Sequence, residues 1–121
     1  MVDNKNEKEL YVAMMQGMIE QLEKRNIKVI QACLDGYEQP VVIDKKKPDI
    51  IGINEDGNRI IVIVEDGKTA DRKYIKERFI EFSKADGEFW VEVSESHSKE
   101  LLDKVKEWRT PVNNWFVCQG I

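Results

Sequence analysis

Three side chains with the chemistry of a metal-dependent hydrolase lie at the ends of two apolar segments. Asp49 begins the segment 49–53, and Asp66 and Lys68 come at the end of the segment 59–65 and just after it. Carboxylate oxygens hold hard divalent cations, and a nearby ammonium group orients water or neutralises charge on a phosphate. Metal-assisted hydrolysis of a phosphodiester requires this set of residue types.

The two apolar segments are expected to form neighbouring antiparallel strands. Glu55-Asp56-Gly57-Asn58 lies between them and is typical of a hairpin turn. A hairpin brings the start of its first strand beside the end of its second. Asp49 and Asp66 are therefore predicted to converge at one corner of a sheet.

Residue parity favours Asp66 over its neighbour Glu65 as the second acid of this site. Asp66 and Lys68 project to the same face if the chain is extended there. Glu65 takes the role instead if Gly67 forms a bulge. The Gly67 carbonyl is expected to point toward the site as a further ligand. Asp66-Gly67 is also a common turn dipeptide, so a turn without chemistry is the competing interpretation.

Periodicity along the rest of the chain predicts one α/β domain over residues 1–121. Helices are expected over residues 5–25, from residue 70 to the turn at 86–87, and from residue 96 or 98 to 110; strands are expected over 27–34, 49–53, 59–65, 88–93 and 114–118. Residues 40–43 form either an irregular connection or a short edge strand. The order is α-β-β-β-α-β-α-β, with helices on both sides of a mixed sheet. The strands at 59–65 and 88–93 are expected to be parallel.

Composition is that of a globular protein, with 41% hydrophobic and 35% charged residues among 121. No apolar run approaches the roughly 20 residues that cross a bilayer, and the N-terminus lacks the pattern of a signal peptide. We therefore expect a cytoplasmic protein that does not enter a membrane. Cys33 and Cys118 lack CxxC spacing, so neither a zinc site nor a disulfide framework is indicated. His97, the only histidine, is expected to be a surface or helix-cap residue rather than a general base.

Positive charge is concentrated around the candidate acids although the net charge is −4. That acidity counts against an obligate nucleic-acid binder, but local patches matter more than the total. Lys45, Lys46 and Lys47 precede the first of the two strands, and Arg72 and Lys73 follow the second. These five side chains are the candidates for holding DNA phosphates.

The motif resembles the core of the PD-(D/E)xK nuclease superfamily, and within it the archaeal-type Holliday junction resolvases. The resemblance covers roughly residues 8–93, and the segments that carry it are Pro48-Asp49-Ile50-Ile51, Ile61-Val62-Ile63-Val64-Glu65, Lys68-Thr69 and Ile80-Glu81-Phe82-Ser83. It implies a restriction-endonuclease-like fold. It also implies an endonuclease that hydrolyses DNA, including branched DNA, with Mg²⁺ or Mn²⁺. Small nucleases of this class are often homodimers.

Carried over residue by residue, the resemblance makes Asp49 and Asp66 the metal ligands and Lys68 the group that positions or activates water. The chain departs from the motif because Glu65 adds one acid. It departs again where the resolvases' opening helix supplies a glutamate and this chain has Met15.

Three polar residues of the opening helix could replace that glutamate, namely Gln16, Glu20 and Glu9. Loss of the ligand would leave a site with weaker metal affinity. A catalytically inactive nuclease-fold module that serves in binding or assembly is therefore the alternative function.

Overall fold

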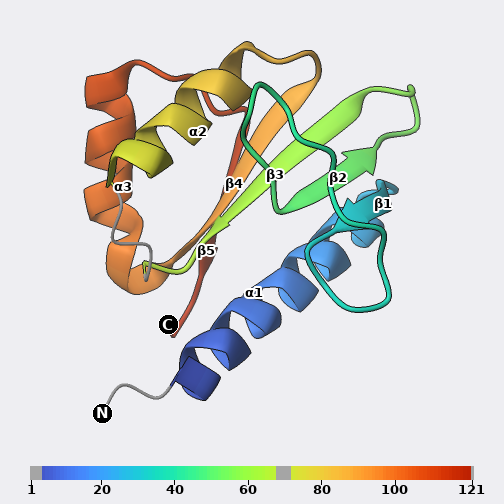
Figure 1. The fold of residues 1–121 in the computed structure, drawn as a ribbon, viewed down its shortest axis with the longest axis horizontal. Coiled ribbons are helices and arrows are strands. Elements are labelled where there is room, and N and C mark those ends of the chain that lie inside the picture. Colours follow the sequence, from blue (N-terminus) through green and yellow to red (C-terminus); the bar gives the residue numbers. More distant parts are fainter. Residues whose placement is uncertain (1–3, 68–71, 121) are drawn as a thin grey trace.

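The computed structural model describes residues 4–67 and 72–120 of the chain (Figure 1). The helices and strands follow one another as α1 (Asn4–Lys24), β1 (Lys28–Ala32), β2 (Ile50–Ile53), β3 (Arg59–Glu65), α2 (Arg72–Lys84), β4 (Glu88–Ser94), α3 (Glu95–Trp108) and β5 (Asn114–Cys118). Within the described residues they form a mixed α/β fold, in which helices flank a five-stranded sheet. No helix in this part of the chain is long and apolar enough to cross a membrane.

The strands lie in the order β1-β2-β3-β4-β5. The pairs β1-β2 and β2-β3 are antiparallel, whereas β3-β4 and β4-β5 are parallel. The antiparallel pairing of β2 with β3 confirms the predicted hairpin. Its turn is closed by Asn54, whose side-chain oxygen accepts hydrogen bonds from the backbone N–H groups of Asp56 and Asn58. The parallel pairing of β3 with β4 was also predicted.

Strand β3 is buried on both faces, as its unbroken apolar sequence indicates. Alternate side chains of the strand enter two separate hydrophobic clusters. Ile60, Val62 and Val64 pack with α1, and Ile61 and Ile63 pack with α2 and α3. Figure 1 shows this division, with α1 on one side of the sheet and the other two helices on the opposite side. The parity of a strand residue therefore tells which helices it faces.

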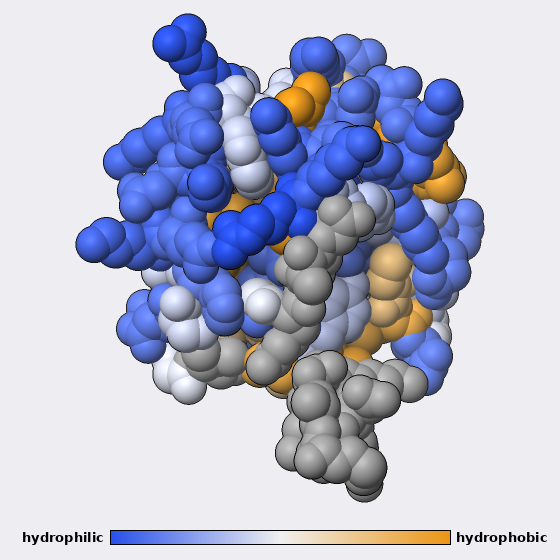
Figure 2. All heavy atoms as spheres, turned by 60° about the vertical axis from the view of Figure 1, so that its left-hand side comes forward, coloured by the Kyte–Doolittle hydropathy of each residue, from blue (hydrophilic) through white to orange (hydrophobic). Residues whose placement is uncertain are grey.

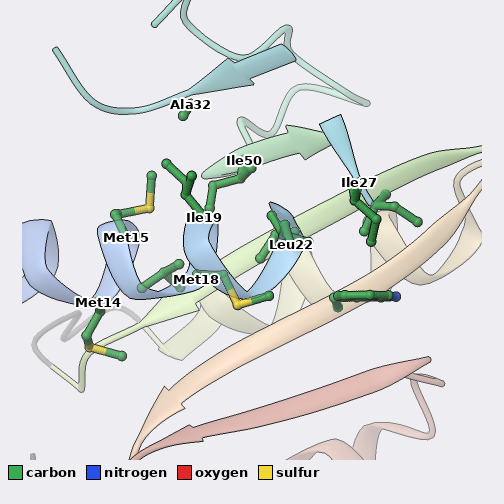
Figure 3. Close-up of a cluster of buried hydrophobic side chains, with 12 residues drawn as sticks. Met14, Met15, Met18, Ile19, Leu22, Ile27, Ala32 and Ile50 are labelled. Carbon is green, nitrogen blue, oxygen red and sulfur yellow. The ribbon is translucent and has the colours of Figure 1, made fainter. Parts of the chain in front are cut away.

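The cluster beneath α1 accounts for the fully buried Met15 (Figure 3). Met14, Met15, Met18 and Leu22 of the helix pack on strand residues such as Ile50. Unbranched methionine side chains fill irregular gaps between a helix and a twisted sheet. The position at which the resemblance would place a glutamate therefore holds a core side chain.

The connection between β1 and β2 is irregular. Residues 40–43 do not add an edge strand to the described sheet; Ile43 forms only an isolated bridge with Lys46. Strand β1 is also shorter than the expected segment 27–34, and its register with β2 shifts between Val29 and Gln31. Beyond Ala32, the Cys33 N–H still donates to the carbonyl of Asp49, whereas the Ala32 N–H donates to the carbonyl of Glu38 in the following loop.

Candidate functional site

Asp49 lies directly before β2, beside the end of β3, and is 7% exposed. Its Oδ2 accepts hydrogen bonds from the backbone N–H of Val64 at 2.8 Å and from Nη2 of Arg78 at 3.0 Å. Its Oδ1 accepts a hydrogen bond from the hydroxyl of Tyr11. Donors from α1, β3 and α2 thus hold this carboxylate, which lies where three elements meet.

Arg78 supplies the positive charge beside Asp49. Its Nη2 also donates to the carbonyl of Lys47 at 2.9 Å, and its guanidinium lies 5.6 Å from the ring centre of Tyr74. Burial by itself lowers the pKa of Arg78, but the charge and hydrogen bond of Asp49, together with the nearby Tyr74 and Glu65, outweigh burial, and the pKa is raised overall. The two residues therefore form a buried, charged pair.

The role of Arg78 was not foreseen from the sequence, which showed it only as one of several basic residues after β3. A signal was present, because Ile75, Arg78 and Phe82 follow helical spacing along the face of α2 that packs on the sheet. A charged side chain on an apolar helical face needs a buried partner of opposite charge. Asp49 is that partner.

Glu65 is the last residue of β3 and is 4% exposed. Burial raises the pKa of its carboxyl group to about 7. The Gly67 N–H, which donates to Oε1 at 3.3 Å, opposes this rise, and the negative charges of Asp66 and Asp49 add to it. Glu65 is thus a second buried acid that feels the charge of Asp49, and it is partly protonated at neutral pH.

The parity argument for Asp66 assumed an extended chain, and the chain is not extended at Gly67, so Asp66 as a metal ligand stays a prediction. Gly67 has a φ of +82°, a left-handed conformation, so the chain turns directly after Asp66. Asp66 is half-buried, and its carbonyl accepts a hydrogen bond from the Ser94 hydroxyl at 3.4 Å. Glu65, which belongs to the strand, is the acid that shares a face with the helix carrying Arg78.

Lys68 lies outside the described residues, so its position relative to Asp49 stays a prediction. The carbonyl of Gly67 likewise remains only an expected ligand. Glu20 is exposed on α1 and lines a separate depression of the surface together with Gln16 and Cys33. The residue of α1 that touches the candidate site is Tyr11, one helical turn before Met15. Burial, followed by the charge of Asp49, raises the pKa of Tyr11, so its hydroxyl keeps its proton.

The predicted phosphate-binding residues lie in the loop before β2 and at the start of α2. Lys46 forms an ion pair with Glu77 at 2.8 Å, and Nζ of Lys47 donates to the side chain of Gln39 at 2.9 Å. Lys45 is exposed in the loop before β2. Arg72 and Lys73 are exposed at the start of α2, where Arg72 forms an ion pair with Glu100 of α3.

A cavity of about 500 Å³ opens beside Glu65 between α2 and α3. The described residues that line it are Glu65, Gly67, Arg72, Lys73, Ile75, Lys76, His97, Glu100, Leu101, Lys104 and Trp108. The buried acid Glu65 therefore faces a space large enough for a small ligand.

His97 was expected near the start of a helix, and it lies in the first turn of α3. It also lies against Gly67, just after the end of β3. A Cβ added at Gly67 would lie 2.2 Å from Nδ1 of His97, so only glycine allows this close approach. Nδ1 is within hydrogen-bond distance of the hydroxyls of Ser94 at 3.2 Å and Ser96 at 3.1 Å. Separation in sequence concealed that the histidine and Glu65 line one cavity.

Asp49 and Glu65 offer carboxylate oxygens, the ligand type that a hard divalent cation takes. The carboxylate of Asp49 has about four acceptor positions, of which protein donors occupy three. Glu65 is buried, and the hydrogen bond that it accepts from Gly67 is long. Among the described residues no three His, Cys, Asp or Glu side chains gather into a metal cluster. An ion here would use two carboxylates and water, an arrangement common for Mg²⁺.

Comparison with known proteins gives no match: no family model fits the chain, and no curated protein or solved structure is significantly similar to it.

Proposed function

We propose that this protein is a Mg²⁺- or Mn²⁺-dependent endonuclease of the PD-(D/E)xK type that hydrolyses phosphodiester bonds in DNA, including branched DNA. The observation that supports the proposal is the placement of the buried Asp49 beside the end of β3, where Glu65 feels its charge. The sheet supports it as well, because an antiparallel hairpin followed by a parallel crossover suits a restriction-endonuclease-like core.

Each residue of the site has a distinct part in this proposal. Asp49 and Glu65 hold the ion, and Arg78 and Tyr11 fix the orientation of the Asp49 carboxylate. Lys68 positions the attacking water; this role follows from the motif. A bound divalent ion would supply an activated water and neutralise charge on the phosphate. Glu65 must lose its proton to serve as a ligand, so at limiting Mg²⁺ cleavage is expected to increase as the pH rises through about 7.

The test is cleavage of a four-way DNA junction and of a linear duplex with Mg²⁺ or Mn²⁺. Glu65→Gln keeps the size of the side chain but removes its charge, so we expect at least a 100-fold loss of rate. Glu92→Gln is the matched control, because Glu92 is an equally buried acid on the opposite face of the sheet and should tolerate the change. Equal rates for Glu65→Gln and the wild type would contradict the proposal, as would a wild type that cleaves neither substrate.

The second candidate function is an inactive nuclease-fold module that binds DNA or a protein partner. The observation in its favour is that the Asp49 carboxylate already has three protein donors, one of them a guanidinium. This function predicts that calorimetry detects no binding of Mn²⁺. A micromolar dissociation constant that Glu65→Gln abolishes would decide for the endonuclease.

A homodimer belongs to the same proposal, since cleavage at two sites of a branched substrate requires two active centres. Sedimentation equilibrium with and without the four-way junction tests it. A monomer in both conditions would exclude paired cleavage by this chain.

A further inference from the structure

The cavity beside Glu65 has two chemically different sides. Ile75, Leu101 and Trp108 contribute apolar surface from α2 and α3. Lys73 and Lys76 are exposed cationic residues on α2 at its rim. At about 500 Å³, the cavity falls within the range typical of small-molecule sites. A ligand that matches both sides carries a flat apolar ring and a negative charge.

The charges around the cavity favour an anion. Arg72 and Glu100 neutralise one another in an ion pair, and Lys104 lies 3.4 Å from Glu107. Neither Lys73 nor Lys76 forms an ion pair within the described chain. Figure 2 shows a face on which hydrophilic residues predominate and apolar residues appear in small patches between them.

Glu65 and His97 lie on the side of the cavity formed by the end of β3 and the start of α3. The carboxyl oxygens of Glu65 accept hydrogen bonds, and the imidazole offers a donor or an acceptor according to its tautomer. Polar edges of a heterocyclic ring make such contacts. These groups therefore suit a nucleobase better than a purely apolar ring.

We propose that this cavity binds a single nucleotide, with the base against Leu101 and Trp108 and the phosphate at Lys73 and Lys76. The inference deepens the proposed function and rests on it for the identity of the ligand, since Glu65 belongs to both sites. A nucleotide held there would be part of the DNA strand next to the bond that is cut. A free mononucleotide has the same chemistry.

Calorimetry without divalent ions separates this inference from cleavage. We expect 5′-dAMP to bind at least tenfold more tightly than either deoxyadenosine or inorganic phosphate, because only the nucleotide has both parts. Equal affinity for phosphate and 5′-dAMP would overturn the role of the base. Absence of binding by 5′-dAMP and by a short single strand carrying a 5′-phosphate would overturn the site, even if the protein cleaves DNA.

The source of the nucleotide is decided by comparing 5′-dAMP with that single strand. Tighter binding of the strand assigns the cavity to DNA, and tighter binding of 5′-dAMP assigns it to a free nucleotide. Both results support a nucleotide site.

Matched lysine variants locate the phosphate. Lys76→Gln is expected to weaken binding of 5′-dAMP about tenfold, because it removes a charged partner of the phosphate. Lys84→Gln, on the same helix but outside the cavity, should leave the affinity unchanged. Lys104→Gln and Lys106→Gln form a second pair on α3; only Lys104 lines the cavity, and because Glu107 partly neutralises it, its effect should be smaller than that of Lys76→Gln. Equal effects within both pairs would show nonspecific attraction and contradict the proposal.

Trp108→Phe tests the contact with the base. The variant should weaken 5′-dAMP binding and leave the affinity for inorganic phosphate unchanged. Its fold is checked by its thermal midpoint, since Trp108 also lies 5.7 Å from the ring centre of Phe79. A folded variant with wild-type affinity for 5′-dAMP would contradict stacking on this residue.

Discussion

Glu65 and Glu92 are two buried acids on neighbouring strands, and they differ mainly in their surroundings. They are 4% and 6% exposed, and the pKa of each is raised to about 7, chiefly by burial. Glu65 faces α2 and α3, where it lines a cavity and feels the charges of Asp49 and Arg78. Glu92 shares parity with Trp90 and so lies on the α1 face.

The environment of Glu92 offers little that stabilises its charge. Its Oε1 is buried and accepts no hydrogen bond from any described residue. Burial accounts for the raised pKa of its carboxyl group. A raised pKa alone therefore does not identify a functional acid. The second acid, the guanidinium and the open cavity distinguish Glu65.

The largest expected effect comes from removing the cation beside Asp49. Arg78→Met leaves Asp49 buried with no cation among the contacts described, and we expect the free energy of unfolding to fall by about 3–5 kcal/mol. Chemical denaturation measures it. Arg72→Met is the control: it breaks an exposed ion pair that solvent screens, so its effect on stability should be much smaller. Similar losses in both variants would show that the buried ion pair contributes no more to stability than the exposed one.

Glu92→Gln is expected to stabilise the protein at alkaline pH. The folded pKa is raised from 4.5 to about 7, so the folded protein binds this proton more tightly than the unfolded chain does. The contribution of Glu92 to the free energy of unfolding is therefore fully present below about pH 4.5 and is lost as the pH rises through about 7. At pH 8.5 the variant should gain on the order of 3 kcal/mol, and at pH 4 almost nothing. An equal gain at both pH values would contradict the assignment.

Divalent ions should separate Glu65 from Glu92. Mn²⁺ or Mg²⁺ bound by Glu65 favours its ionised form and lowers its pKa, whereas the pKa of Glu92 should stay at about 7. Carboxyl carbon chemical shifts followed through a pH titration with Mg²⁺ measure both residues in one experiment. If Mg²⁺ changes neither pKa, Glu65 does not bind the ion, and the difference between the two acids does not reflect a metal site.

The smallest effect is expected at the contact between α1 and the site. Tyr11→Phe removes the hydroxyl that donates to Oδ1 of Asp49, and should lower the free energy of unfolding by about 2 kcal/mol. Tyr37→Phe is the control, because Tyr37 is exposed in the loop between β1 and β2. Thermal or denaturant unfolding measures both. If the two variants are equally stable, Tyr11 does not help to hold Asp49.

Local sequence patterns predicted the elements that carry the site. The run Ile60–Val64 indicated a central strand, and its side chains do enter cores on both faces. The turn at 55–58 predicted the hairpin, since turn residues and strand pairing are adjacent in sequence. The position of Asp49 beside the end of β3 could be predicted from this hairpin alone.

The contacts around the candidate site were not predictable from neighbours in sequence. The parity rule does not apply beyond Asp66, because one backbone angle at Gly67 ends the extended conformation. Arg78, Tyr11 and His97 reach the site from three different helices.

The sequence by itself determined a mixed α/β core, a hairpin, and a concentration of acidic and basic residues around its open end, because these depend on periodicity and turn chemistry. Only the tertiary structure decided that Glu65 is buried facing a cavity, and that a guanidinium neutralises Asp49. The physical reason is that charge interactions and burial depend on distances between helices and strands, and packing of the whole chain sets those distances.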